Sequence, residues 1–258
     1  MIRELEVATR AATLAADAVK AIYDTQDFEV VQKTGDRGPL TEADLRANQI
    51  LHELLGEAFP EDAILSEETK DSGQRLSQSR VWIIDPVDGT REFTLGIPEF
   101  CVSVGFVQDG RAVVGVLVNP ATGDVIAGAE GHGVTFNGEP VGCSSHGTLQ
   151  GARLLVSRSE YEKGWFDHLE GLARLTPMGS VAWKFGLVAA GHAEASFTPK
   201  PRNEWDLCAG AACILAAGGE ATNGAGERYQ FNRPDPLHIG VCGTNGVLHA
   251  ECLALIQR

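Results

Sequence analysis

Two aspartates follow directly on an apolar run in the stretch VWIIDPVDGTREF, which begins at Val81. The run predicts a buried strand, so Asp85 and Asp88 would leave the sheet near its core, where unpaired ionised carboxylates are costly. A divalent cation offsets that cost, because Mg²⁺ binds a few carboxylate oxygens together with water and phosphate oxygens. Gly89 and Thr90 then open a predicted helical turn whose backbone N–H groups can bind a phosphate. The stretch therefore indicates a cation site beside an anion site.

The same stretch has two other interpretations. Asp-Pro and Asp-Gly are common turn formers, so both carboxylates could simply be solvated at a turn. The stretch also resembles the D-x-D-G-T loop of the haloacid dehalogenases, whose first Asp becomes phosphorylated. Two residues rather than one separate Asp85 from Asp88, however, and the motif lies well inside the chain. We therefore favour the metal site over a phosphorylated aspartate.

The charge balance limits the partners of the protein. The 258 residues include 21 Lys and Arg against 35 Asp and Glu, which gives a formal net charge of −14 at pH 7. So acidic a chain is poorly suited to the phosphate backbone of a nucleic-acid polymer. It can still bind a small phosphorylated metabolite if metal ions neutralise the site.

The cysteines and the first residues of the chain indicate its compartment. None of the six cysteines forms a C-x-x-C pair, which predicts small buried side chains in a reducing environment. The stretch before residue 24 carries charges throughout and lacks an apolar run long enough to span a membrane. We therefore expect a cytoplasmic protein without a membrane segment.

Hydrophobic periodicity predicts two helices at the start of the chain. Apolar residues recur at helical spacing over residues 1–23. A second helix begins after Thr41, a favourable N-cap residue, and is expected to place Leu45, Leu51 and Leu55 on its inner face. A short strand, FEVVQK, is predicted between the two helices.

The pattern changes near residue 142. Before it, alternating apolar runs are separated by Asp-Gly, Asn-Pro and Asn-Gly turns, which are typical of antiparallel hairpins. After it, strands alternate with helices, and one helix is predicted over residues 160–173. We expect an α/β (α+β) fold in two parts, residues 1–142 with helices over a mainly antiparallel sheet and residues 143–258 with a mixed sheet and helices. No flexible linker separates the parts, so they should share an interface.

The acidic stretch resembles the signature W-x-x-D-P-x-D-G-T of the inositol monophosphatase superfamily, whose members are Mg²⁺-dependent, Li⁺-sensitive phosphatases. Trp82 and the residues from Asp85 to Thr90 match this signature. Further matches are spread in order across nearly the whole chain: Lys33, Asp44 in LTEAD, Glu67 and Glu68 in LSEE, and Asp206 in WDLCAG.

The resemblance implies a layered αβαβα sandwich with the active site between its two halves, and two to three Mg²⁺ ions at that site. One ion would be held by Glu67, Asp85 and the carbonyl of Val87. A second would be held by Asp85, Asp88 and Asp206. A third, more weakly held ion would contact Glu67.

For the reaction, the resemblance implies that a metal-activated water attacks phosphorus in line, without a covalent phosphoenzyme. Thr90 and Asp44 would take the proton from this water, with Glu68 nearby in the metal shell. Each acid also has a purely structural interpretation. Asp44 and Asp206 could stabilise helix N-termini, and Glu67 and Glu68 could be a solvated pair at the end of a strand.

The residues after the signature favour a nucleotide substrate. Arg91, Glu92 and Phe93 resemble the D-G-T-K-E-F sequence of the 3'(2'),5'-bisphosphate nucleotidases, the branch that removes the 3'-phosphate from adenosine 3',5'-bisphosphate. In the superfamily an inositol-binding Glu lies several residues before W-D. That position falls near Pro199, where this sequence has no acid.

Basic residues near the signature Asp206 are candidates for substrate binding. Lys200 and Arg202 could bind a second phosphate, although they could also be solvated loop charges. Lys184, on a predicted helix, could reach the site or have a structural role. The reacting phosphate would be bound by Gly89 and Thr90.

Other functions remain open from the sequence alone. Inositol 1-phosphate, fructose 1,6-bisphosphate or another sugar phosphate are alternative substrates. A non-catalytic relative that only binds metal or nucleotide is the remaining alternative, but the matched acids and Thr90 are all present, which favours an enzyme. A homodimer is also compatible with the resemblance, since dimers are common in the superfamily.

Overall fold

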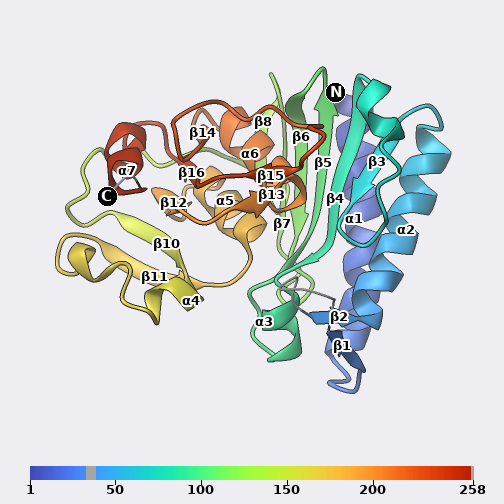
Figure 1. Ribbon diagram of the computed structural model, residues 1–258, viewed down its shortest axis with the longest axis horizontal. Helices are drawn as coiled ribbons and strands as arrows, with labels where there is room; N and C mark the ends of the chain where they lie inside the picture. The colour runs from blue at the N-terminus through green and yellow to red at the C-terminus, as the bar shows by residue number, and fades with distance from the viewer. Residues whose placement is uncertain (33–38, 257–258) are drawn as a thin grey trace.

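The computed structural model describes residues 1–32 and 39–256, and it folds into five alternating layers (Figure 1). Helices α1 (Ile2–Tyr23) and α2 (Glu42–Ala58) cover one face of a seven-stranded sheet. Helices α5 (Val181–Ala189) and α6 (Glu204–Ala216) lie between this sheet and a five-stranded one. Helix α7 (His249–Ile256) packs on the outer side of the second sheet. The predicted αβαβα sandwich is therefore confirmed.

The seven-stranded sheet contains every hairpin predicted from the turns. Neighbouring strands pair antiparallel, except for the parallel pair β3–β4 at one edge. The strands, in spatial order, are β3 (Ala63–Ser66), β4 (Arg80–Asp88), β5 (Cys101–Gln108), β6 (Arg111–Val118), β7 (Val125–Ala129), β8 (Gly133–Phe136) and β9 (Glu139–Val141).

The five-stranded sheet is mixed, as expected for the second part of the chain. Its order is β11-β10-β12-β16-β14, with parallel pairing on both sides of β10 and antiparallel pairing on both sides of β16. The strands are β10 (Arg153–Ser157), β11 (Arg174–Met178), β12 (Ala195–Thr198), β14 (Glu220–Asn223) and β16 (Val241–Thr244).

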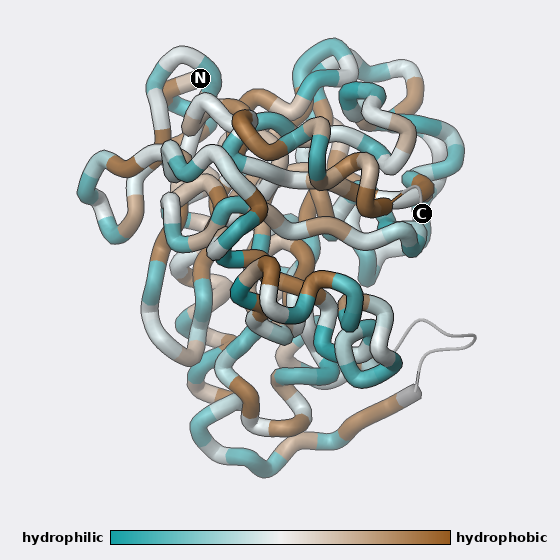
Figure 2. The backbone as a smooth tube through the Cα atoms, turned by 90° about the vertical axis from the view of Figure 1, so that its left-hand side faces the viewer, coloured by the Kyte–Doolittle hydropathy of each residue, from teal (hydrophilic) through white to brown (hydrophobic). Residues whose placement is uncertain are grey.

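Short elements connect these layers and frame the space between them. They are β1 (Val30–Gln32), β2 (Pro39–Thr41), η1 (Gln74–Ser77), α3 (Thr90–Thr94), α4 (Arg158–Tyr161), η2 (Asp167–Leu169), β13 (Arg202–Asn203) and β15 (Leu237–His238). Hydrophilic residues are frequent in the outer turns of the chain (Figure 2).

Strand β4 explains why the run VWII has no polar positions. Trp82 and Ile84 belong to the core under α1 and α2, while Val81 and Ile83 belong to the core around α5 and α6. Because both faces of the strand are covered by helices, alternation of polar and apolar residues is lost. All four side chains are completely buried, as the sequence predicts.

A β-bulge lies where β4 meets the acidic motif. Asp85 pairs with Ser103 and Asp88 with Cys101, so three steps along β4 match two steps along β5. In a regular strand, residues three apart point to opposite faces of the sheet. The extra residue in the bulge cancels this alternation and turns both carboxylates toward the same face. That face is the one covered by α6, since Ser103 Oγ lies 3.4 Å from the carbonyl oxygen of Trp205.

Three sequence predictions need correction or fall outside the described residues. Leu45 is 53% exposed, so it is not on the inner face of α2. The helix predicted over residues 160–173 is replaced by the short elements α4 and η2, because Gly164 between them takes a φ of +74°. Lys33, matched to the superfamily above, lies outside the described residues.

The division of the chain at residue 142 stays a prediction. None of the described helices is long and apolar enough to cross a membrane.

Helix α6 approaches the seven-stranded sheet at two glycines that pair across β5 and β6. A Cβ atom at Gly115 would lie 2.0 Å from the carbonyl oxygen of Ala209, and one at Gly105 would lie 2.4 Å from Cys208 Sγ. The glycines therefore allow the close contact that brings the first turn of α6 beside the bulge.

We expect Gly115→Ala to destabilise the protein, because its new methyl group meets a backbone oxygen that cannot rotate away. Overpacking of this kind costs on the order of 3 kcal/mol, so thermal unfolding should show a Tm lower by about 6–12 °C. Gly56→Ala is the matched control, since Gly56 lies in α2 with nothing within 4 Å of the added Cβ. That variant should be unchanged or more stable by up to about 1 kcal/mol. Equal Tm values for the two variants would contradict the close-contact argument.

Candidate active site

Three carboxylates meet at the junction of the bulge and α6. Asp85, Asp88 and Asp206 each offer an oxygen within 4.8 Å of the others. Asp85 is 1% exposed and accepts a hydrogen bond from the Val87 N–H at 3.0 Å. Asp206 lies more than a hundred positions after Asp85 and Asp88 in the sequence. The resemblance to the superfamily led us to expect the three carboxylates at one site.

Asp206 is the third residue of α6, and one of its oxygens has a structural role. Its Oδ2 accepts the N–H of the N-cap residue Asn203 at 3.0 Å. This bond satisfies a backbone donor that the helix leaves without an intrahelical acceptor. The same carboxylate is part of the acidic cluster. The structural and the functional interpretations of Asp206 are therefore compatible.

The cluster is electrostatically strained in the absence of a cation. Burial, followed by the proximity of Glu67 and then of the other two aspartates, raises the pKa of Asp85 well above its usual value. Burial and the neighbouring carboxylates raise the pKa of Asp206 to about 8. Burial also raises the pKa of Asp88, although hydrogen bonds from Ser180 Oγ and the Ala182 N–H, both 2.6 Å, oppose this rise. The three groups cannot all be ionised without a compensating positive charge.

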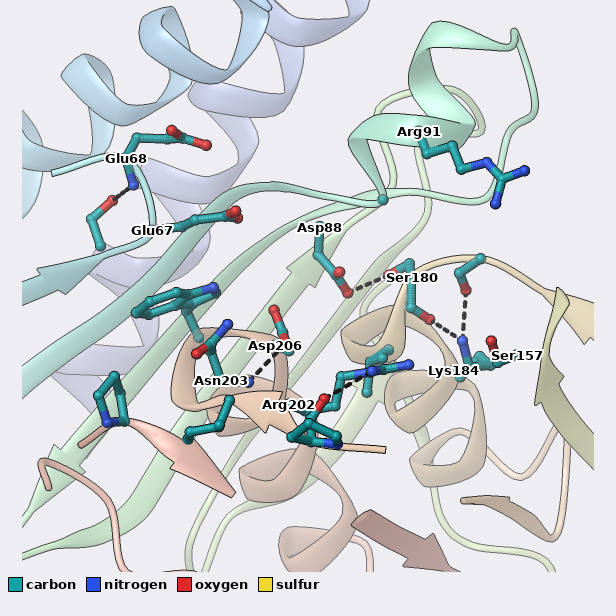
Figure 3. Close-up of a pocket in the computed structure, with 18 of the residues that line it drawn as sticks. Glu67, Glu68, Asp88, Arg91, Ser157, Ser180, Lys184, Arg202, Asn203 and Asp206 are labelled. Carbon is teal, nitrogen blue, oxygen red and sulfur yellow. Dashed lines mark hydrogen bonds between the residues drawn. The ribbon is translucent and has the colours of Figure 1, made fainter. Parts of the chain in front are cut away.

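This donor set fits a hard divalent cation. It consists only of oxygens, lies close together and is largely buried, which matches the ligand preference of Mg²⁺. Glu67 follows directly on β3, and its side chain extends toward Asp88 (Figure 3). Glu68 lines the same pocket, and its N–H donates to Ser66 Oγ at 3.2 Å. The predicted carbonyl ligand, that of Val87, lies 3.0 Å from Thr90 Oγ1, which is also within reach of Asp44 Oδ1.

Thr90 and Asp44 are in contact, as the resemblance implies. Thr90 Oγ1 lies 3.1 Å from Asp44 Oδ1, and both side chains are buried. The other oxygen of Asp44 accepts the N–H of Thr41 at 2.8 Å and its hydroxyl at 2.7 Å, which completes a capping box at the start of α2. Asp44 is therefore held in a fixed orientation with one oxygen directed at Thr90. As with Asp206, the helix-capping and catalytic interpretations of this side chain are compatible.

A pocket of about 1110 Å³ adjoins the cluster and is lined by both acidic and basic side chains. Its acidic end is formed by Glu67, Glu68, Asp88 and Asp206. Arg91, Ser157, Lys184 and Arg202 lie on its other walls (Figure 3). The lining also includes Lys70, Glu92, Arg158, Ser159, Gly179 and Asp235. Gly89 also lines the pocket and takes a φ of 101° as the N-cap of α3, a conformation that favours glycine.

Lys184 supports the wall of the pocket. Its buried ammonium donates to three carbonyl oxygens, those of Met178 at 3.2 Å, Gly179 at 3.0 Å and Ser180 at 2.8 Å. Burial lowers its pKa to about 8. These bonds hold the loop that presents Ser180 to Asp88. All three N–H donors are in use, so the geometry supports the structural alternative for Lys184 more than direct contact with substrate.

The two predicted phosphate ligands differ in position. Arg202 lines the pocket, whereas Lys200 does not. The Lys200 ammonium lies 5.0 Å from the centre of the Trp165 ring and 3.9 Å from Glu160 Oε1. Arg202 Nη2 is 3.7 Å from the same oxygen of Glu160, a fully buried side chain. Of the two cations, only Arg202 is placed to contact a ligand in the pocket.

Several residues at the site were not predicted from the sequence, and two of them, Ser180 and Glu160, contact predicted site residues. Ser180 is the N-cap of α5 with a φ of +49°, and its hydroxyl links the Trp183 N–H to Asp88. A serine directly before the predicted helix VAWKF is a recognisable N-cap signal. Glu160 lies beneath Lys200 and Arg202, and nothing in its local sequence distinguishes it from a surface glutamate.

Removing divalent cations should make the stability of the protein depend on pH. Folding raises the pKa values of Asp85 and Asp206. The free energy of unfolding is therefore highest, as far as these groups are concerned, below about pH 4, and it falls as the pH rises through about 8. In EDTA we expect the Tm to fall by at least about 5 °C between about pH 5 and about pH 8. Excess Mg²⁺ should remove most of this fall, because it binds the ionised cluster of the folded state.

The control for this experiment is Asp206→Asn, which removes one titrating carboxyl from the cluster. In EDTA its Tm should change less with pH than that of the wild-type protein. A profile as steep as the wild-type one would show that the pH dependence arises elsewhere.

A layered α/β fold with a buried acidic cluster in a polar pocket is the arrangement of a metal-dependent phosphatase. Residues 3–258 match the model of the inositol monophosphatase family, and the chain belongs to that family. Its members are phosphatases that depend on a metal, typically Mg²⁺, and the triad of Asp85, Asp88 and Asp206 can hold such an ion.

Curated relatives and solved structures agree with this assignment. The chain is 30% identical over 234 residues to the fructose-1,6-bisphosphatase/inositol-1-monophosphatase of Thermotoga maritima, which covers 89% of this chain and 86% of the relative. It is 32% identical over 224 residues to the 3'(2'),5'-bisphosphate nucleotidase CysQ of Escherichia coli, and the match covers 84% of this chain and 89% of the relative. A solved structure of a Thermotoga maritima IMPase superposes with a TM-score of 0.87 at 26% identity, covering 98% of this chain and 96% of the other.

Proposed function

We propose that the protein is a Mg²⁺-dependent 3'(2'),5'-bisphosphate nucleotidase that hydrolyses adenosine 3',5'-bisphosphate to AMP and phosphate. The observation that carries this proposal is the charge of the pocket lining, which combines the acidic residues Glu67, Glu68, Asp88 and Asp206 for cations with five basic side chains, those of Lys70, Arg91, Arg158, Lys184 and Arg202. A substrate with two separated phosphates can use the cations at the acidic residues for one phosphate and a basic side chain for the other. The 32% identity to a relative named as such a nucleotidase supports the same choice.

In this proposal the acids of the chain hold two to three Mg²⁺ ions. Glu67, Asp85, Asp88 and Asp206 would be the carboxylate ligands, and Val87 would contribute its carbonyl oxygen. When bound, the ions supply charge neutralisation and an activated water for attack on phosphorus. The side chains themselves arrive preorganised, because Asp85 and Asp88 are fixed by the bulge and Asp206 by its cap on α6.

Thr90 and Asp44 would move the proton. The Thr90 hydroxyl donates to Asp44, which leaves its oxygen lone pairs free to accept a proton from water in the pocket. Asp44 accepts two further hydrogen bonds from Thr41, which hold its carboxylate in place behind Thr90. In this proposal Thr90 is the proton acceptor and Asp44 the carboxylate behind it, next to the pocket residues Asp88 and Gly89, and Glu68 lines the same pocket.

A second candidate substrate is fructose 1,6-bisphosphate, which also carries two phosphates. The Thermotoga maritima relative named for both fructose-1,6-bisphosphatase and inositol-1-monophosphatase favours it. Inositol 1-phosphate fits less well, because no acid stands at Pro199 and Arg202 lines the pocket instead.

The test is phosphate release with Mg²⁺, compared as kcat/KM across adenosine 3',5'-bisphosphate, adenosine 3'-monophosphate, fructose 1,6-bisphosphate and inositol 1-phosphate. We expect adenosine 3',5'-bisphosphate to exceed each of the others by at least about 10-fold. A preference for inositol 1-phosphate, or no release from any of them, would overturn the proposal. The same assay with added Li⁺ tests the predicted lithium sensitivity.

Three further features belong to the proposal. We expect a cytoplasmic location, a division of the chain into residues 1–142 and 143–258, and a homodimer. Gel filtration with light scattering tests the last of these.

A further inference from the structure

The basic side chains of the pocket are not equally available to a ligand. Arg158 is paired with Glu99, to which its Nη2 donates at 2.7 and 2.5 Å, and it also donates to the Pro177 carbonyl. Lys184 uses its ammonium on three loop carbonyls. Arg202 donates to the Pro201 carbonyl and lies 3.7 Å from Glu160. Each of these cations is at least partly neutralised by the protein.

Arg91 is different. Within the described residues its guanidinium makes no hydrogen bond or ion pair, and the residue is exposed while lining the pocket. It lies on the first turn of α3, three positions after Asp88 of the acidic cluster. Its side chain extends from α3 into the space above Ser180 and Ser157 (Figure 3). Arg91 and Arg202 thus approach the pocket from opposite walls.

The geometry points to Arg91 as the residue that binds the second anionic group of the substrate and so determines specificity for bisphosphates. This inference rests on the proposed function and deepens it by naming a ligand for the phosphate that is not hydrolysed. A guanidinium can bind a phosphate through two parallel N–H donors. The Arg91 guanidinium would not have to break an existing hydrogen bond within the described residues to do so. The hydroxyls of Ser157 and Ser159, 3.2 Å apart, line the same part of the pocket and offer further donors.

The spacing along the chain supports this assignment. Three residues span at most about 10 Å even when fully extended, and Arg91 is held closer to Asp88 because it lies in a helical turn. A small molecule with one phosphate at the acidic cluster therefore remains within reach of the Arg91 side chain. A neutral or monophosphorylated substrate would leave this guanidinium without a partner.

The kinetic test compares adenosine 3',5'-bisphosphate with adenosine 3'-monophosphate for the wild-type protein, Arg91→Ala, Arg91→Lys and Arg174→Ala. Arg174→Ala is the matched control. Arg174 is exposed on β11 and does not line the pocket, and its substitution removes the same positive charge. In Arg91→Ala we expect kcat/KM for the bisphosphate to fall about 10- to 100-fold and that for the monophosphate to change less than about 3-fold. Arg91→Lys should be intermediate, and Arg174→Ala should keep the wild-type ratio.

A binding measurement separates this inference from the proposed function. AMP carries only the 5'-phosphate, so its Kd, measured by calorimetry with Mg²⁺ present, reports contacts to that group without turnover. We expect Arg91→Ala to weaken AMP binding about 10-fold or more and to leave adenosine binding unchanged. Equal AMP affinity in the wild-type protein and Arg91→Ala, or an equal loss in Arg174→Ala, would overturn the role of Arg91. If the wild-type protein instead fails to prefer the bisphosphate, the proposed function fails, and the AMP measurement still decides whether Arg91 binds a phosphate.

Discussion

Replacing Asp85 or Asp206 by asparagine is expected to lower Mg²⁺-dependent phosphate release by at least about 10³-fold. Both carboxylates belong to the cluster that fits the cation, and metal ions contribute several kcal/mol to stabilisation of the transition state. About 4 kcal/mol corresponds to this factor. The measurement is kcat/KM at saturating Mg²⁺, with phosphate detected directly.

The same variants should not lose stability, which separates a catalytic effect from misfolding. Each substitution removes one of the mutually repelling carboxyls whose pKa values are raised by burial and proximity. Their Tm values in EDTA near neutral pH should therefore equal or exceed the wild-type value. Asp17→Asn, on the exposed side of α1, is the control and should be wild-type in both measurements. Wild-type turnover in Asp85→Asn or Asp206→Asn would exclude the metal site described above.

Thr90→Val should lower kcat by about 10²- to 10⁴-fold and leave the Tm nearly unchanged. Valine keeps the shape of threonine but removes the hydroxyl that lies 3.1 Å from Asp44. Because the hydroxyl is the proposed acceptor for the proton of water, its loss acts on the chemical step. Phosphate release under saturating substrate, together with thermal unfolding, measures both quantities.

Thr41→Val is the matched control, since Thr41 also donates its hydroxyl to Asp44, but to the other oxygen. Loss of this N-cap costs about 1 kcal/mol, so the Tm should fall by about 2–4 °C. Its kcat should stay within about 3-fold of wild type. If the two valine variants lost activity equally, Thr90 would have no special role and Asp44 would matter only for the structure.

The sequence predicts the layers and the acidic cluster for reasons that are local. Trp82 to Ile84 are apolar on both faces of a strand, which only helices on both sides of the sheet can cover. The placement of Asp88 is less obvious, because regular alternation would direct it away from Asp85. Only the paired register with Ser103 and Cys101 reveals the bulge that brings both to one face.

The features that could not be predicted depend on tertiary contacts. Lys200 and Arg202 are equivalent in the sequence, but the ring of Trp165 holds Lys200 outside the pocket while Arg202 lines it. Leu45 follows the helical period loosely and still faces solvent, because Ala43 and Ala47 occupy the buried side of that turn. The positive φ of Gly164 ends a helix that composition alone favours.

The two helix-capping aspartates affect how relatives of this protein should be compared. Asp44 and Asp206 each accept the backbone N–H of an N-cap residue, so natural selection for folding alone would retain an acid at both positions. A homologue that had lost its activity could therefore keep both residues over long evolutionary times. Thr90 caps no helix with its side chain, and its substitution would be among the first signs of a degenerate enzyme. In alignments of this family, a pseudoenzyme is better recognised by the residue at position 90 than by a count of acids.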